Sequence, residues 1–274
     1  MSQYSVGLFA MLALAATAAH AEEKVGEEPQ KDARWQELYR SEAAEYEFSM
    51  IGSQREKLDL QPQPVMQWVS LNDFNGDVFI WKRAGRPEVV GSIFSFPAGT
   101  ADQRNVMHEF HSLSAEPVEA AGVNGRLFAF SEGVEIKPVP GAPPPAESAT
   151  RRRLQARALA REFSAHMNRQ GERWQLRLLN QPLYSYEASS DGILGGALFA
   201  FVGYITDPEI LVLIEARDTP DGRQWVYAPA RFSDKSLWLN HKEQEVWSYR
   251  ADSPQSEVLY YLAPRKTVSL PADE

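Results

Sequence analysis

The chain has 274 residues, of which 43% are hydrophobic, 24% charged and 11% aromatic, proportions that are typical of a folded protein. They exclude a disordered chain, a collagen-like chain and a coiled coil. The 28 Lys and Arg residues are outnumbered by 37 Asp and Glu residues, and the net charge of -9 makes nucleic acid an unfavourable partner. The chain has no cysteine, which excludes disulfides, thiol catalysis and thiolate metal ligands.

The first 21 residues have the pattern of a secretory signal peptide. They contain no Asp, Glu, Lys or Arg, and an apolar run over residues 8–18 ends at Ala19-His20-Ala21, a small-x-small cleavage pattern. That run is shorter than the roughly 20 apolar residues that cross a bilayer, so cleavage is favoured over the alternative of an uncleaved anchor. We expect an exported protein, periplasmic or extracellular, with no integral membrane span after signal cleavage.

Residues 22–33 are acidic and polar, and this composition predicts a disordered spacer. Over residues 34–50, apolar side chains such as Trp35 and Tyr39 roughly follow helical spacing, which predicts a helix. Short segments rich in Val, Ile, Phe and Trp follow, each bounded by Gly, Pro or Asn, a pattern typical of antiparallel strands with tight turns. Residues 34–136 are therefore expected to form a first unit of a helix and a sheet.

Residues 137–147 contain five prolines, which lack backbone donors and disfavour helical geometry, and this segment is predicted to be a linker. Residues 148–169 have an apolar stripe around Leu159, which predicts a second helix. Strand patterns then resume, so residues 148–250 are expected to form a second unit of a helix and a sheet. The remaining residues, 251–274, are expected to be an irregular C-terminal tail.

The two units share four collinear blocks of sequence. Two of these blocks contain identical pairs, Gln63-Pro64 with Gln181-Pro182 and Pro87-Glu88 with Pro208-Glu209. Chance similarity between strands with proline-rich edges is the alternative to duplication. We predict an α+β fold of two tandem copies of a helix followed by an antiparallel β-meander, packed as an intrachain pseudo-dimer with a ligand cleft between the copies.

Four stretches between residues 35 and 249 carry a resemblance to a known family. They are residues 109–114, 176–186, 196–209 and 245–248, and they include Glu109-Phe110-His111-Ser112, Gln181-Pro182, Thr206-Asp207-Pro208-Glu209 and Glu245-Val246-Trp247-Ser248. With these stretches the chain resembles a family of uncharacterised exported proteins from planctomycete bacteria. The resemblance implies export and a shared fold, and it implies no activity, substrate or catalytic residue.

The best candidate for acid–base or metal chemistry is the run His108-Glu109-Phe110-His111, since the chain has no nucleophile elbow, phosphate-binding loop or metalloprotease motif. On a strand, Glu109 and His111 point to one face and His108 to the other. One imidazole and one carboxylate are too few to hold a metal, so we predict no metal site and no cofactor. Hydrogen-bonded strand histidines are the alternative to a catalytic role.

Two groups of residues are candidates for ligand binding. Trp81, Tyr184 and Tyr186 have rings that stack on flat ligands, although cross-strand packing also explains such residues. Three arginines recur on one face of the second predicted helix and would attract an anion, although a solvated helix face or pairing with the acidic first helix explains them equally; they are Arg153, Arg157 and Arg161.

These patterns favour a non-enzymatic exported module that has a binding or structural role. Its partner would be an unknown small molecule or an envelope protein. The alternative is an envelope hydrolase or metal-dependent enzyme that is centred on His108, Glu109 and His111.

Overall fold

The computed structural model describes residues 28–51, 55–122, 125, 127–187, 192–252, 259–263 and 266–269. The predicted signal peptide lies outside the described residues. Within them, the chain forms two α-helices, α1 (Glu28–Ala44) and α2 (Ala149–Ala160), a 3-10 turn η1 (Leu71–Asp73) and three antiparallel sheets. Neither helix has the length and apolar character that a membrane crossing requires.

The three sheets differ in size. The small sheet contains, in spatial order, β2 (Glu56–Lys57), β1 (Glu47–Met50), β8 (Val118–Ala121) and β9 (Leu127–Phe130). The N-terminal sheet contains β3 (Asp59–Leu60), β4 (Met66–Val69), β5 (Asn75–Arg83), β6 (Arg86–Ala98), β7 (Thr100–Ser112), β19 (Tyr260–Leu262) and β20 (Lys266–Ser269). The C-terminal sheet contains β10 (Lys137–Pro138), β11 (Phe163–Arg169), β12 (Glu172–Leu178), β13 (Tyr184–Glu187), β14 (Ile193–Val202), β15 (Pro208–Thr219), β16 (Gly222–Arg231), β17 (Leu237–His241) and β18 (Gln244–Tyr249).

The prediction of an α+β fold built from two helix-plus-meander copies is wrong. The described chain is mostly strand, and its strands form three antiparallel sheets. Both helices end earlier than predicted, α1 at Ala44 and α2 at Ala160, and a strand follows each of them. In β11 the buried residues alternate with less buried ones, which is the period of a strand with one buried face. The same apolar residues also fit a helical stripe when the sequence is viewed alone.

Segments that were expected to lack regular structure also contribute to the fold. Helix α1 begins at Glu28, inside the expected acidic spacer. Strand β10 lies in the expected linker and pairs with β16. Strands β19 and β20 lie in the expected C-terminal tail and pair with β7, so the end of the chain completes the N-terminal sheet.

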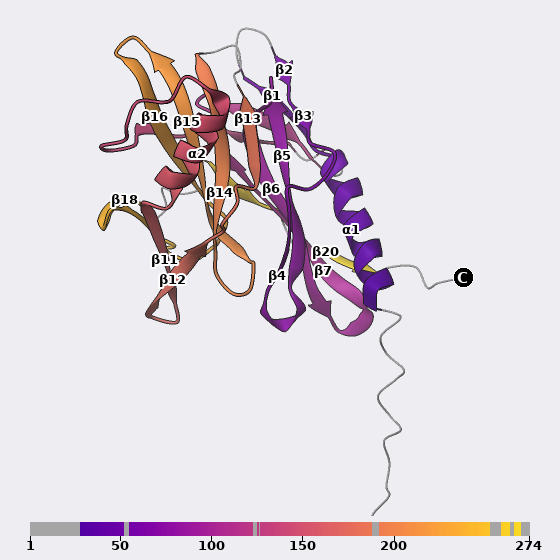
Figure 1. Cartoon of the computed structure of the whole chain (residues 1–274). Helices are drawn as coiled ribbons and strands as arrows, with labels where there is room; N and C mark the ends of the chain where they lie inside the picture. Colours follow the sequence, from indigo (N-terminus) through magenta and orange to yellow (C-terminus); the bar gives the residue numbers. More distant parts are fainter. Residues whose placement is uncertain are drawn as a thin grey trace, which may run out of the picture.

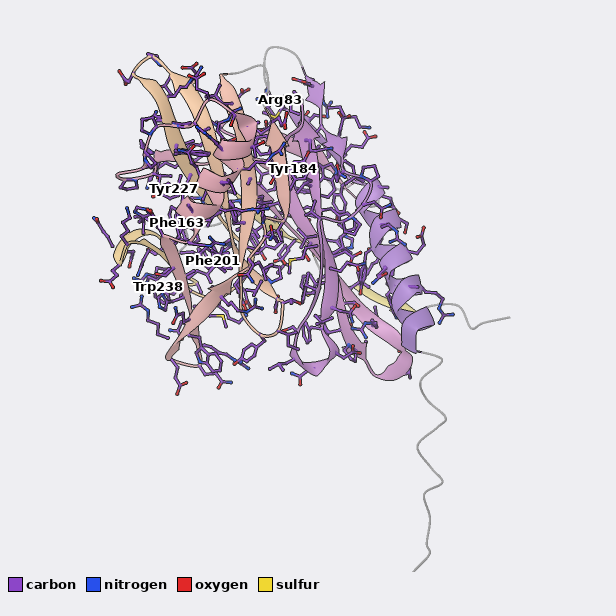
Figure 2. The ribbon with its side chains drawn as sticks, viewed as in Figure 1. Arg83, Phe163, Tyr184, Phe201, Tyr227 and Trp238 are labelled. Carbon is purple, nitrogen blue, oxygen red and sulfur yellow. The ribbon has the colours of Figure 1, made fainter. Side chains whose placement is uncertain are left out.

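The two large sheets face each other in a layered molecule (Figure 1). Between them lies an interior cluster, to which the N-terminal sheet contributes Val78, Ile80 and Val90 and the C-terminal sheet contributes Leu198, Leu211 and Leu213. Helix α1 covers the outer face of the N-terminal sheet, together with the small sheet. Helix α2 covers the outer face of the C-terminal sheet, where Phe163, Phe201 and Tyr227 pack (Figure 2).

Strands β14 and β15 are buried on both faces. Leu198 and Ala200 face the interior cluster, whereas Phe199 and Phe201 face α2. Apolar residues at successive positions of both strands account for this double burial. The space between the two large sheets, where a ligand cleft was expected, is occupied by the packed interior cluster.

The strand pairings follow the same order in the two halves of the chain. Strands β4, β5, β6 and β7 pair in succession, and so do β13, β14, β15 and β16. Strand β1 pairs with β8, and β8 with β9, as β11 pairs with β17 and β17 with β18. The two halves differ at Leu58. This residue separates β2 from β3, so the small sheet is detached from the N-terminal sheet. In the C-terminal half, β12 is continuous and pairs with both β11 and β14.

A buried ion network joins the two large sheets. Arg86 donates from Nε to Glu215 Oε1 at 2.7 Å and from Nη1 to Glu88 Oε2 at 2.7 Å. Arg217 donates to the second oxygen of Glu215 at 2.6 Å, and Tyr186 donates to the first. Burial would raise the pKa of Glu215, but the guanidinium groups of Arg86 and Arg217 hold that pKa below its ordinary value.

The substitution Arg86→Met should destabilise the protein by about 3–5 kcal/mol, because Glu88 and Glu215 then lose their shared buried cation. Arg223→Met is the matched control, since Arg223 forms an exposed ion pair with Glu147 and should cost less than about 1 kcal/mol. Urea denaturation followed by circular dichroism measures both losses. Similar small losses in the two variants would contradict a structural role for the network.

Candidate functional site

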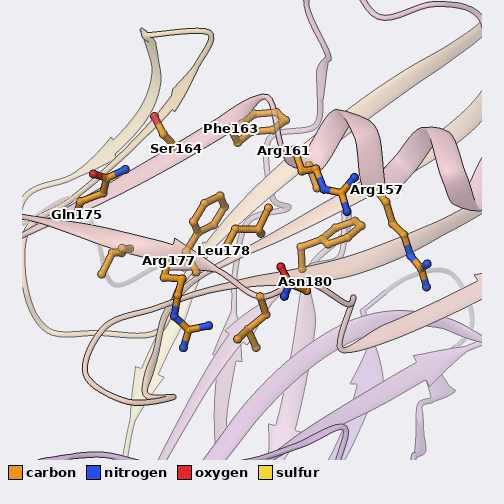
Figure 3. A pocket seen from close by; sticks show the side chains of 13 residues that line it. Arg157, Arg161, Phe163, Ser164, Gln175, Arg177, Leu178 and Asn180 are labelled. Atoms are coloured by element: carbon orange, nitrogen blue, oxygen red, sulfur yellow. The ribbon is translucent and has the colours of Figure 1, made fainter.

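A cavity of about 530 Å³ opens on the outer face of the C-terminal sheet, beside the end of α2 (Figure 3). We call it the main cavity. Its floor is apolar and its rim is polar, and it is lined by Arg157, Ala160, Arg161, Phe163, Ser164, Gln175, Leu176, Arg177, Leu178, Leu179, Asn180, Phe199 and Phe201. The volume lies within the range of small-molecule sites, which is roughly 300–1,000 Å³.

The apolar floor follows from the local structure of three strands. Phe199 and Phe201 belong to the face of β14 that points away from the interior cluster. Phe163 is the first residue of β11, and Leu176 lies opposite Ala165 on β12. These side chains pack together under the end of α2, so an apolar ligand body would lie on aromatic rings.

Helix α2 supplies the arginines at one rim of the main cavity. The helix is capped by Ser148, whose Oγ accepts a hydrogen bond from the backbone N–H of Arg151 at 3.3 Å. Arg157 and Arg161 are four residues apart and therefore lie on the same side of the chain. Neither guanidinium group has a hydrogen-bond or ion-pair partner within the described part of the chain, and Figure 3 shows both groups near the cavity.

The opposite rim consists of polar residues of β12 and the turn after it. Arg177 donates from Nη2 to the carbonyl oxygen of Ile205 at 2.8 Å, which fixes its position. Gln175 and Asn180 are exposed and lie on the same rim. The described lining residues thus include three arginines and no Asp or Glu, so the cavity is positively charged in a chain of net charge -9.

Such an arrangement is suited to binding an anion that carries an apolar body. Guanidinium groups donate paired hydrogen bonds to carboxylate, sulfonate or phosphate oxygens, and the aromatic floor offers apolar surface beside them. The described residues that line the main cavity include no His, Asp or Glu. The arginines and the aromatic floor offer recognition of charge and shape.

Of the arginines that the sequence singled out, Arg157 and Arg161 line the main cavity. Arg153 is exposed instead and forms an ion pair with Glu187. The sequence analysis missed Arg177 and the aromatic floor. The available signal was the pair Phe199 and Phe201, at alternating positions of a strand that is apolar on both faces. Only the pairing of the strands places these two residues under α2.

The three aromatic candidates pack within the protein. Trp81 is 1% exposed, and its Nε1 donates to the carbonyl oxygen of Tyr46 at 3.3 Å. The hydroxyl of Tyr184, labelled in Figure 2, donates to the carbonyl oxygen of Gly85 at 3.2 Å. Tyr186 donates to the buried carboxylate of Glu215. Their rings therefore connect layers of the fold and do not line the main cavity.

The run from His108 to His111 is split between two faces of β7, as its spacing predicted. The Nδ1 atom of His108 lies 2.6 Å from the hydroxyl of Tyr46, and its Nε2 is hydrogen-bonded to the carboxylate of Glu42 in α1. On the other face, Nδ1 of His111 donates to the carbonyl oxygen of Ser112 at 2.6 Å. Burial lowers the pKa of His111 to about 4, which leaves it neutral at neutral pH.

Glu109 is a buried acid on the inward face of β7. The hydroxyl of Tyr260 donates to its Oε2 at 2.8 Å. Burial, with smaller contributions from the carboxyl groups of Asp207 and Glu209, raises the pKa of Glu109 to about 8. Among the described residues, no three His, Cys, Asp or Glu side chains are grouped so that they could hold a metal ion.

The substitution Glu109→Gln should make the stability of the protein less sensitive to pH. Folding raises this pKa from 4.5 to about 8, so the contribution of Glu109 to stability is complete below pH 4.5 and is lost as the pH rises through 8. Between pH 6 and 8 the free energy of unfolding of the wild type should fall by on the order of 1 kcal/mol per pH unit more than that of the variant.

Thermal and urea unfolding at several pH values measure this difference. Glu245→Gln is the control, because Glu245 is an exposed residue of the edge strand β18 and its loss should leave the wild-type profile unchanged. A Glu109→Gln profile that runs parallel to the wild type would contradict the prediction.

Comparison with known proteins adds no relative to this picture. No family model matches the chain, and no curated protein and no solved structure matches it either.

Proposed function

We propose that this chain is an exported, non-enzymatic binding module that holds a small amphiphilic anion in the main cavity. The observation that carries the proposal is the pair Arg157 and Arg161, whose guanidinium groups have no protein partner among the described residues and lie beside the floor of Phe199 and Phe201. An acid group would pair with the arginines, and its apolar body would cover the rings. The contact between the apolar body and the rings removes apolar surface from water, which stabilises the complex by about 25 cal/mol for each Å² buried.

Export is supported by the apolar N-terminal pattern that ends at Ala19-His20-Ala21 and by the resemblance to exported planctomycete proteins. We also propose that the sequence contains an internal repeat. Its support is the recurring order of strand pairings, in which β4 to β7 correspond to β13 to β16. The pairs Gln63-Pro64 and Gln181-Pro182 precede equivalent strands in the two halves.

The enzyme alternative gains no support from its three candidate residues. His108 is separated from Glu109 and His111 by the backbone of β7. Tyr46, His108 and Glu42 do form a hydrogen-bonded chain, but each is at most 6% exposed and none lines the main cavity. These hydrogen bonds anchor α1 to the N-terminal sheet.

The proposal predicts that the charged dye 8-anilinonaphthalene-1-sulfonate binds at least about tenfold more tightly than N-phenyl-1-naphthylamine, which has the same rings and no sulfonate. The double variant Arg157→Gln, Arg161→Gln should lose this preference and keep the affinity for the neutral dye. Fluorescence titration of the folded protein measures both affinities.

A matched control removes two charges away from the main cavity, in the double variant Arg151→Gln, Arg223→Gln. This control should bind the charged dye as the wild type does. Equal affinities of the wild type for the two dyes, or an equal loss in both double variants, would refute the proposal.

A further inference from the structure

Exposed apolar side chains meet where the end of β4 lies against the turn between β14 and β15 (Figure 1). Thr206 of the turn joins the two segments, because its backbone N–H donates to the carbonyl oxygen of Val69 at 3.1 Å and its Oγ1 accepts from the N–H of Val69 at 3.0 Å. Val69 is 48% exposed, Leu71 of η1 is 43% exposed and Ile205 is 52% exposed. None of these three is among the described residues that line the main cavity.

The exposed apolar surface continues onto two aromatic rings. Arg177 of β12 donates to the carbonyl oxygen of Ile205 at 2.8 Å, which ties the turn to β12. The ring of Tyr204 lies 5.0 Å from that of Trp174, which is 38% exposed. Trp and Tyr are enriched at boundaries between water and apolar phases, membrane interfaces included. We call this surface the tip patch, and it consists of Val69, Leu71, Trp174, Tyr204 and Ile205.

Ile205 has a backbone conformation that its side chain disfavours. Its φ is 54°, in the left-handed region, where Gly and Asn are favoured and a β-branched residue is an outlier. Because half of the side chain is exposed, burial within the protein does little to offset this strain. Strained residues of this kind cluster at functional sites, which indicates that Ile205 contacts something outside the chain.

The charges beside the tip patch favour a partner that carries phosphate. The guanidinium carbon of Arg169 lies 3.9 Å from the ring centroid of Tyr204, and this group has no hydrogen-bond or ion-pair partner within the described residues. The hairpin of β11 and β12 contains three arginines and a single acid, Glu172. Asp73 of η1 is already paired with Arg104 at 2.6 Å. A guanidinium group that stacks on a ring keeps its donors for phosphate oxygens.

We propose that the tip patch docks the protein on the surface of a lipid bilayer that contains anionic lipid. Leu71 and Ile205 enter between the headgroups, the two aromatic rings lie at headgroup level, and Arg169 pairs with lipid phosphates. Because the apolar residues belong to separate short connections, mobile headgroups accommodate them more readily than a rigid protein surface, which needs a matched shape. The acids elsewhere in the chain oppose this contact weakly, since salt screens charges beyond about 10 Å.

This inference goes beyond the proposed function and does not depend on it, because no apolar residue of the tip patch lines the main cavity. Co-sedimentation tests it with vesicles of phosphatidylcholine that contain about 30% phosphatidylglycerol. The double variant Leu71→Ser, Ile205→Asn should bind these vesicles at least about tenfold more weakly than the wild type. The wild type should bind vesicles of phosphatidylcholine alone at least about threefold more weakly than the mixed vesicles.

The matched control is the double variant Leu127→Ser, Leu154→Ser, which removes two leucines that are 76% and 60% exposed on β9 and α2. It should bind the mixed vesicles as the wild type does. Ile205→Asn alone should raise the melting temperature by about 2–4 °C, because Asn adopts a positive φ more readily than Ile. Weaker vesicle binding in a more stable protein separates a role in docking from a role in folding.

A local measurement uses the absence of cysteine from the chain, which allows one position at a time to be labelled. An environment-sensitive nitrobenzoxadiazole label on Ile205→Cys should shift its emission to shorter wavelength when mixed vesicles are added, and the same label on Leu127→Cys should not. A shift at both positions or at neither, or equal vesicle binding by the two double variants, would overturn the inference. So would a wild type that ignores vesicles and forms a dimer that Leu71→Ser, Ile205→Asn loses, since the tip patch would then join two copies of the chain.

Discussion

Apolar residues on both faces of β14 and β15 are the constraint on which the rest of the structure depends. Because successive side chains of a strand point to opposite faces, Leu198 and Phe199 pack into different layers. One face closes the interior against the N-terminal sheet, and the other receives α2. The floor of the main cavity belongs to this second face, so the position of the candidate site follows from the same alternation that builds the core.

The arginines of this chain fall into two groups according to their partners. Arg86 is buried between the large sheets with two carboxylates, and Arg104 of β7 bonds Asp73 and Ser95. Such arginines hold parts of the fold together. The guanidinium groups of Arg157 and Arg161 instead lie at the main cavity without a protein partner among the described residues, although the chain has more acids than bases. The proposed binding site therefore uses arginines that no structural network among the described residues uses.

Part of the site could be predicted from the sequence, because that part depends on local spacing. The spacing placed Arg157 and Arg161 on one helix face, and it placed His108 on the opposite face of its strand from Glu109 and His111. The same reasoning failed over residues 163–169, where Phe163, Ala165 and Met167 form a strand. Short apolar runs fit both periods, and only the pairing of this segment with β12 and β17 decides between them.

The sequence by itself determined the local properties: the alternation within strands, the turns between them, the helical stretch of α2 and the absence of cysteine. Tertiary structure alone decided which strands pair, and so it decided that the last strands join β7 and that Arg177 faces Arg161 across the main cavity. The physical reason is that pairings between distant segments depend on the packing of whole layers. No short stretch of residues carries that information, whereas the two faces of a strand are fixed by backbone geometry at every position.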